Sequence, residues 1–88
     1  MEALFEKTFL LDLEKMQDKH ILKQVRDVIS QAKSAESAGG IKGLNIMRDY
    51  ESCHRINLGD YRIGIQLQMG KLIFVRLIHR KDMYRYFP

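Results

Sequence analysis

The 88 residues predict a single α+β domain in which two N-terminal helices pack on a twisted antiparallel sheet and a short helical turn ends the chain. Three observations support this fold class. Apolar residues recur at helical spacing up to about residue 34. From Glu51 onward the apolar period changes to two, which is typical of strands. Two turn signals, Gly59-Asp60 and Met69-Gly70, divide this second half into separate strands.

The first half is expected to form a short edge strand followed by a helix pair. Residues 2–7 are the candidate strand. Thr8 could cap a helix that starts at Phe9, and Asp18 a second helix, because their side-chain oxygens can accept hydrogen bonds from free backbone N–H groups. The second helix carries one apolar stripe, which indicates a face that covers a sheet. Its members are Ile21, Val25, Val28 and Ala32. Gly39-Gly40 marks the stop after this helix.

The second half is expected to form three consecutive strands. Residues 52–58 and 61–68 flank the two-residue hairpin signal Gly59-Asp60. Residues 72–78 are nearly all apolar, which indicates a central strand that is buried on both faces. Asp82 is a candidate cap for a final helical turn over residues 83–87.

The first hairpin predicts which side chains share a face. If Gly59-Asp60 is the whole loop, Asn57 lies opposite Arg62 and Arg55 lies opposite Gly64. Arg55, Asn57 and Arg62 then stand on one face of the sheet. Gly64 either leaves a gap beside Arg55 that could admit a sugar or a base, or marks a bulge.

The second turn extends this count to the third strand. Through Met69-Gly70 it places Arg62 opposite Leu77, with His79 next along the same face. The end of the third strand is therefore expected to approach Arg55 and Arg62. A bulge in either strand would change this register.

Charge is unevenly distributed along the chain. The net charge is +4, and residues 48–88 supply the whole excess with eight basic and four acidic residues. Their cations are mostly arginines, whose planar fork suits bidentate contact with phosphate. The last ten residues add a histidine and two tyrosines to this basic end. The arginine-bearing surface is expected to bind nucleic acid, less tightly as salt rises.

Other features exclude several classes of protein. Apolar runs are too short for a membrane span, and the N-terminus is not expected to act as a signal peptide. A single cysteine, Cys53, excludes an internal disulfide and fits a reducing cytoplasm. One cysteine and three scattered histidines are poor material for a zinc site, so we expect neither metal nor cofactor.

The order of elements and several motifs resemble the RelE/ParE superfamily of bacterial toxins, and its RelE-like branch in particular. The resemblance covers most of the chain, and its most specific parts are GDYRI at residues 59–63 and HRKDMYR at residues 79–85. Members of the RelE-like branch are endoribonucleases that cut messenger RNA, typically in the ribosomal A site. The resemblance also implies an acidic antitoxin that wraps the toxin.

The resemblance assigns roles to four residues. Arg55 matches a basic residue on the strand before the hairpin, Arg62 the arginine that holds the scissile phosphate, and Arg80 a second phosphate-binding arginine. Tyr84 matches the C-terminal tyrosine that stacks on a base and assists catalysis. Three positions depart from the pattern and leave the general base open, namely Asn57, His54 and His79.

The remaining candidates follow from the chemistry of metal-free RNA cleavage. A proton carrier is needed, and the candidates are His79, His54, Tyr84 and Glu51. His79 is favoured because an imidazole titrates near neutral pH and this one adjoins Arg80. His54 is expected to be a packed histidine more often than a catalytic one. Tyr86 is a candidate for base stacking, and Arg48, Arg76, Lys81 and Arg85 for the electrostatic footprint on RNA.

Three functions remain open at this point. The leading one is a ribosome-dependent mRNA endonuclease that attacks with the substrate's own 2′-hydroxyl and inhibits translation. The second is a ParE-like inhibitor of DNA gyrase. The third is a non-catalytic RNA-binding module, which Asn57 in place of a basic residue favours.

Overall fold

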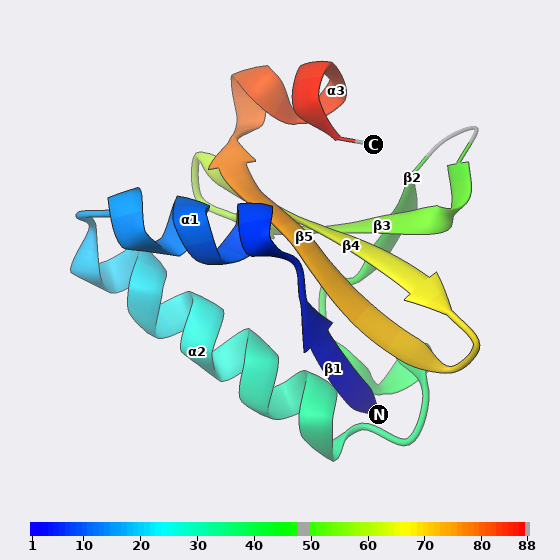
Figure 1. Cartoon of the computed structure of the whole chain (residues 1–88). Coiled ribbons are helices and arrows are strands. Elements are labelled where there is room, and N and C mark those ends of the chain that lie inside the picture. The colour runs from blue at the N-terminus through cyan, green and yellow to red at the C-terminus, as the bar shows by residue number, and fades with distance from the viewer. Residues whose placement is uncertain (48–49, 88) are drawn as a thin grey trace.

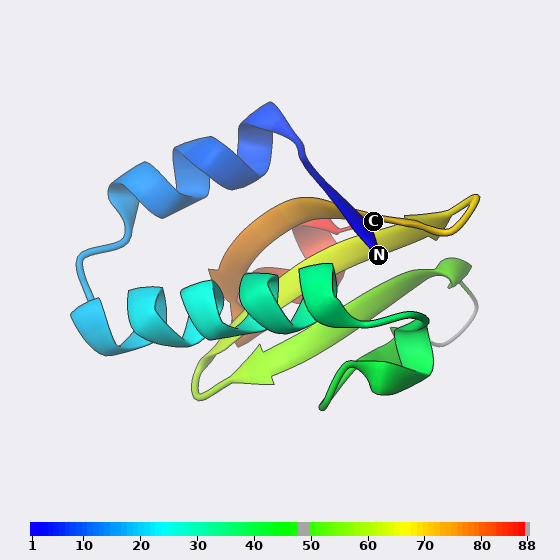
Figure 2. The ribbon, with the colours of Figure 1, turned by 90° about the horizontal axis from the view of Figure 1, so that it is seen from below.

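The computed structural model describes residues 1–47 and 50–87, and its main feature is a five-stranded sheet in the order β1-β5-β4-β3-β2. The strands are β1 Glu2–Phe5, β2 Asn45–Met47, β3 Tyr50–Leu58, β4 Tyr61–Gln68 and β5 Lys71–His79. Two helices cover one face, and the C-terminal turn lies on the other (Figures 1 and 2). The predicted α+β class is therefore confirmed.

The sheet is mixed: strands β2 to β5 are antiparallel, as predicted, and β1 adds a parallel strand at the edge. β1 runs parallel to β5, with Glu2 opposite Lys71 and Phe5 opposite Phe74. The pairs β2–β3, β3–β4 and β4–β5 are antiparallel. Strands joined by a tight turn must be antiparallel, whereas β1 and β5 are far apart in the sequence and no turn sets their direction. The predicted edge position of the first strand is confirmed.

The helix pair is confirmed, but one of its two predicted caps is wrong. α1 spans Lys7–Lys15 and α2 spans Lys19–Ser34. The Asp18 carboxylate accepts hydrogen bonds from the backbone N–H groups of His20 (2.9 Å) and Ile21 (3.2 Å), as predicted. Thr8 lies inside α1 instead of preceding it.

Thr8 is used to complete the edge of β5. Beyond the end of β1, the backbone N–H of Glu6 and the hydroxyl of Thr8 donate to the carbonyls of Phe74 (2.9 Å) and Val75 (2.6 Å). Further along, the Asp12 carboxylate accepts from the backbone N–H of Leu77 at 2.9 Å. Helix α1 and the residue before it thus pair with backbone groups of β5 that would otherwise be left open beyond the end of β1.

The larger apolar core lies between the helices and the sheet. The stripe predicted on α2 is buried there, as are inward-facing residues of β3, β4 and β5. Phe9 of α1 is fully buried, with its ring centroid 5.4 Å from that of Phe74. We call this side of the sheet the helix face.

The hairpin register is confirmed, but its extension to β5 was wrong. Asn57 lies opposite Arg62 and Arg55 opposite Gly64, as predicted. A shift in register between Gly64 and Ile65 then displaces β5 by one residue, so Arg62 lies opposite Ile78 instead of Leu77. His79 consequently pairs with Tyr61 and belongs to the helix face, away from Arg62.

The C-terminal segment covers the other side, which we call the C-terminal face. It consists of a 3₁₀ turn, Arg80–Asp82, and a short helix α3, Met83–Tyr86. Met83 and Phe87 form a second, smaller core with Met47, Cys53 and Ile78. Asp82 precedes α3 but makes no side-chain cap. Instead, Nδ1 of His79 accepts from the backbone N–H of Lys81 at 3.1 Å. No helix in the described part of the chain is long and apolar enough to cross a membrane.

Candidate functional site

Arg55, Asn57 and Arg62 stand on the C-terminal face, as the hairpin register predicted. Asn57 and Arg62 are directly opposite each other, and Arg55 is two pairs further from the turn. Asn57 is exposed, and the two arginines are half-buried. Because a two-residue turn determines the pairing on both sides of it, the sequence alone was sufficient to bring these three side chains together.

Arg62 and Arg80 both contact the turn between β3 and β4. Nη1 of Arg62 donates to the carbonyl oxygens of Gly59 (2.7 Å) and Tyr61 (2.8 Å). The backbone N–H of Arg80 donates to the carbonyl of Asp60 at 2.7 Å, and Nε of Arg80 lies 3.8 Å from the Asp60 carboxylate. Two guanidinium groups from separate elements therefore gather around one hairpin turn.

Tyr84 of α3 joins this group through Arg55. Its hydroxyl oxygen accepts a hydrogen bond of 2.8 Å from Nη1 of Arg55. The Tyr84 side chain is nevertheless mostly exposed, at 62%. A tyrosine held by a cation at its hydroxyl end, with its ring open to solvent, can stack on a splayed base or pass a proton.

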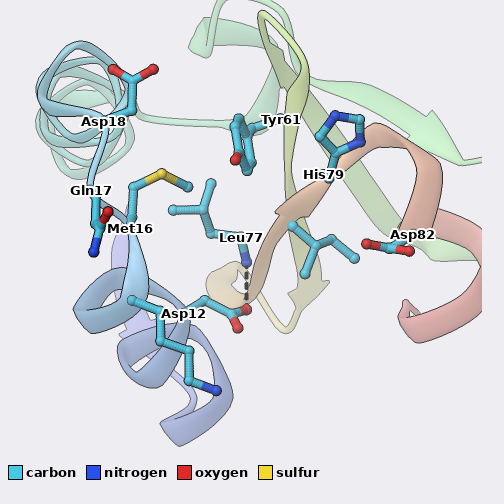
Figure 3. Close-up of a pocket in the computed structure, with 10 residues that line it drawn as sticks. Asp12, Met16, Gln17, Asp18, Tyr61, Leu77, His79 and Asp82 are labelled. Carbon is cyan, nitrogen blue, oxygen red and sulfur yellow. Dashed lines mark hydrogen bonds between the residues drawn. The ribbon is translucent and has the colours of Figure 1, made fainter.

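His79 does not face these arginines, so its predicted place beside Arg62 was wrong. It lies edge-on to Tyr61, with ring centroids 5.5 Å apart. Both residues line a cavity of about 430 Å³ near the connection between α1 and α2, together with Met16 and Asp18 (Figure 3). The cause is the bulge at Gly64, which moves the end of β5 by one residue and so turns His79 to the helix face.

His54 and Gly64 are both buried, whereas a residue that contacts a ligand would be open to solvent. His54 is only 5% exposed, so it is packed inside the protein, the more frequent of the two expectations for it. The gap expected beside Gly64 is filled by the ring of Phe87, which is itself buried. The alternative interpretation of Gly64 as a bulge position is confirmed.

Arg76, a predicted member of the electrostatic footprint on RNA, forms an ion pair with Asp12 of α1. Its Nε and Nη2 donate to the two carboxylate oxygens of Asp12 at 2.8 and 3.1 Å. The hydrogen bond to Asp12 raises the pKa of Arg76, although partial burial acts in the opposite direction. Asp12 lies 64 residues away in the sequence, so no local pattern revealed this pairing.

The remaining candidates lie around α3 or outside the described residues. Lys81, Arg85 and Tyr86 are exposed, and the Arg85 guanidinium lies 5.4 Å from the centre of the Tyr86 ring. Arg48 and the side chain of Glu51 lie outside the described residues. Within the described part of the chain, no three His, Cys, Asp or Glu side chains group together as metal ligands would.

Sequence reasoning did not assign a role to Asp60. Its carboxylate is 70% exposed and lies beside Arg80, where it partly offsets the charge of that arginine. The Gly59-Asp60 signal placed Asp60 at the tip of the turn. Its partner Arg80, however, comes directly after β5, and only the tertiary structure shows that the two side chains are close.

Comparison with known proteins identifies the family. No protein-family model matches the chain. The chain is 37% identical to Toxin RelE3 of Methanocaldococcus jannaschii over 89 residues, which cover 100% of both sequences. It also matches a chain of the crystal structure of the RelB-RelE antitoxin-toxin complex from Methanococcus jannaschii. That match has a TM-score of 0.81 and 36% identity over 97% of this chain and 99% of the other.

A more distant likeness shows the fold alone. The YoeB/ParE toxin from Agrobacterium tumefaciens superposes with a TM-score of 0.68 at 16% identity, covering 90% of this chain and 98% of that one. The fold is thus common to several toxin branches, and full-length identity is what distinguishes among them. Given its 37% identity over the full length of a RelE toxin, this chain belongs to the RelE family within the RelE/ParE superfamily of toxins.

Proposed function

We propose that this chain is the toxin of a toxin–antitoxin pair and that it inhibits translation by cutting messenger RNA in the ribosomal A site. The observation that carries the proposal is the gathering of the Arg62 and Arg80 guanidinium groups around the Gly59-Asp60 turn. Tyr84 and Arg55 lie on the same face of the sheet. Such a group can hold one phosphodiester from two sides and place a hydroxyl group near it.

The reaction uses the 2′-hydroxyl of the RNA as nucleophile. Its oxygen attacks the adjacent phosphorus and loses its proton, the bond from phosphorus to the 5′-oxygen breaks, and the 5′-oxygen takes up a proton. The products are a 2′,3′-cyclic phosphate and a 5′-hydroxyl. Negative charge grows on the phosphorane oxygens in the transition state, so fixed cations accelerate the step.

Arg62 is suited to this electrostatic role because of how it is held. Its two hydrogen bonds go to neutral carbonyl oxygens and are both donated by Nη1. The carbonyls orient the guanidinium without cancelling its charge, and the other edge of the fork can face a phosphate. Arginine stays protonated in proteins, so it stabilises charge and does not carry the proton.

Tyr84 is the proton carrier that the geometry favours. His54 is buried and His79 lies on the helix face, whereas the Tyr84 hydroxyl is exposed on the face that carries Arg62. The Tyr84 oxygen accepts from Arg55, so its own proton remains available for the leaving 5′-oxygen. No metal ion or cofactor enters this scheme.

The test is cleavage of a defined message on purified ribosomes. We expect new 5′ ends inside translated codons, and no cut where the nucleotide bearing the attacking oxygen is replaced by its 2′-deoxy form. Arg62→Ala should lower the single-turnover cleavage rate by about 10²- to 10³-fold, as removal of one preorganised donor does elsewhere. Lys71→Ala is the matched control, because it removes one positive charge from the distant β4–β5 end of the sheet.

Three outcomes would contradict the proposal. A folded Arg62→Ala protein that cleaves at the wild-type rate would remove Arg62 from the mechanism. Intact transcripts accompanied by a DNA-damage response would favour inhibition of gyrase. Binding of the message without cleavage would leave a binding module.

We further propose an acidic antitoxin as partner in the cytoplasm, where messages and ribosomes are found. The related Methanococcus jannaschii structure is a RelB-RelE antitoxin-toxin complex. The net charge of +4 and the arginines of the C-terminal face suit an acidic segment that covers the site. Such a segment would compete with RNA for the same cations.

A further inference from the structure

Three aromatic side chains in and directly after the short helix α3 hold it over the sheet, and each contacts a different strand. Tyr84 is hydrogen-bonded to Arg55 of β3 at 2.8 Å, and Phe87 packs against Gly64 of β4. The Tyr86 ring centre lies 5.8 Å from the guanidinium of Arg76 in β5. We propose that Gly64 and Phe87 are a positioning pair, which sets how closely α3 approaches the sheet and thereby places Tyr84 beside Arg55. This inference rests on the proposed function.

Gly64 is required by space and not by backbone conformation. A β carbon at this position would lie 2.7 to 2.9 Å from three ring carbons of Phe87, closer than such atoms are found in proteins. The described glycines with positive φ are Gly43, Gly59 and Gly70, so the backbone of Gly64 would accept alanine. The three nearest atoms that a side chain would meet there all belong to the ring of Phe87.

The register links this packing directly to Tyr84. Gly64 and Arg55 are directly opposite each other across β3 and β4. Tyr84 and Phe87 are three residues apart on one helical turn, closed by a 2.9 Å hydrogen bond from Phe87 N–H to Met83 C=O. The opposed residues Arg55 and Gly64 therefore contact Tyr84 and Phe87, which lie at the two ends of one helical turn. A shift of Phe87 must for this reason also shift Tyr84.

α3 has little means of holding this position by itself. It has four residues, and an isolated helix of that length is unstable in water. Its place is set by burial of Met83 and Phe87 against Met47, Cys53 and Ile78. A methyl group at residue 64 would lift Phe87 out of this small core and draw Tyr84 away from Arg55.

The experiment is a double-mutant cycle on the full chain, with Gly64→Ala, Phe87→Ala and the double variant. Gly64→Ala should slow single-turnover cleavage about 10- to 100-fold when Phe87 is present, since a displacement of about 1 Å can cost that much. In the Phe87→Ala background, where the ring is gone, the same substitution should change the rate by less than about twofold. Gly39→Ala is the matched control, because its new methyl group would lie 3.8 Å from Oγ of Ser37, an ordinary contact distance, and its φ is not positive.

A second measurement reports the contact itself and does not depend on activity. A nuclear Overhauser contact between the Tyr84 ring and the Arg55 side chain should be present in the wild type and in Gly39→Ala, and lost in Gly64→Ala. An equal effect of Gly64→Ala in both backgrounds, or a Gly64→Ala protein that keeps both the contact and its cleavage rate, would overturn the inference. If the wild type cuts no message, the proposed function fails, while the spectra still decide whether Gly64 and Phe87 place Tyr84.

Discussion

The helix face and the C-terminal face of the sheet differ in how much core they bury and in what they leave exposed. In the described part of the chain, one cluster of thirteen buried apolar residues lies on the helix face, and a cluster of five lies on the C-terminal face. The small cluster supports a short helix and leaves arginines and Tyr84 accessible at its margin. Stability is therefore concentrated on one face, and chemistry can be placed on the other.

Arg76 and Arg62 illustrate the difference at the level of one side chain. Arg76 is neutralised by a bidentate pair with Asp12. Arg62 is held by two neutral carbonyl groups of the hairpin turn. A carboxylate cancels the charge of a guanidinium, whereas a carbonyl holds its geometry and leaves its charge available. Arg62→Ala should accordingly change the free energy of unfolding by less than about 1 kcal/mol, although we expect it to slow cleavage about 10²- to 10³-fold.

The largest effect on stability is expected from Phe9→Ala on the helix face. Phe9 is 0% exposed and packs on Phe5 and Phe74, so its loss leaves a cavity. The free energy of unfolding should fall by about 3–5 kcal/mol in urea denaturation. Leu10→Ala, next in the same helix but 47% exposed, is the control and should cost well under half as much. Similar losses from both variants would mean that α1 packs differently.

A smaller effect is expected from Asp12→Ala at the edge of β5. The substitution leaves the Arg76 guanidinium and the backbone N–H of Leu77 without their acceptor, and both groups are partly buried. The expected loss is about 2–3 kcal/mol, measured by the same denaturation. Asp12→Asn removes the charge and one acceptor oxygen but keeps an acceptor for Leu77 N–H, so it should lose less. If Asp12→Asn were as damaging as Asp12→Ala, the ion pair alone would carry the effect.

The smallest effect is expected from Asp18→Ala at the start of α2. It removes the acceptor for the N–H groups of His20 and Ile21 and should cost about 1 kcal/mol. Asp18→Asn should restore most of this, because asparagine caps about as well. Thermal unfolding of the three proteins would compare them. A loss in Asp18→Asn equal to that in Asp18→Ala would show that charge, and not capping, matters at this position.

Local signals predicted those parts of the fold that depend on neighbours in the sequence. The cap at Asp18, the apolar stripe of α2 and the register around Gly59-Asp60 were all read correctly. Each depends on residues within one or two helical turns or across a two-residue loop. The same signals placed Arg55, Asn57 and Arg62 on one face of the sheet, in agreement with the observed register.

The errors arose where a distant residue determines the outcome. Thr8 offers a typical cap, but the open edge of β5 uses its hydroxyl instead. The bulge at Gly64 shifts β5 and moves His79 to the helix face. The gap beside Gly64 is filled by Phe87, which is 23 positions further along the chain and buried by the tertiary fold.

The amino-acid sequence by itself determined the element types, the hairpin pairing and the clustering of arginines, because periodicity, capping and tight turns act over short separations. Only the tertiary structure decided which cations stay available. Asp12 reaches Arg76 from α1, Asp60 meets Arg80 from a neighbouring hairpin, and Phe87 closes over Gly64. Contacts between residues far apart in the chain depend on packing and register, and a one-residue bulge is enough to move a side chain from one face to the other.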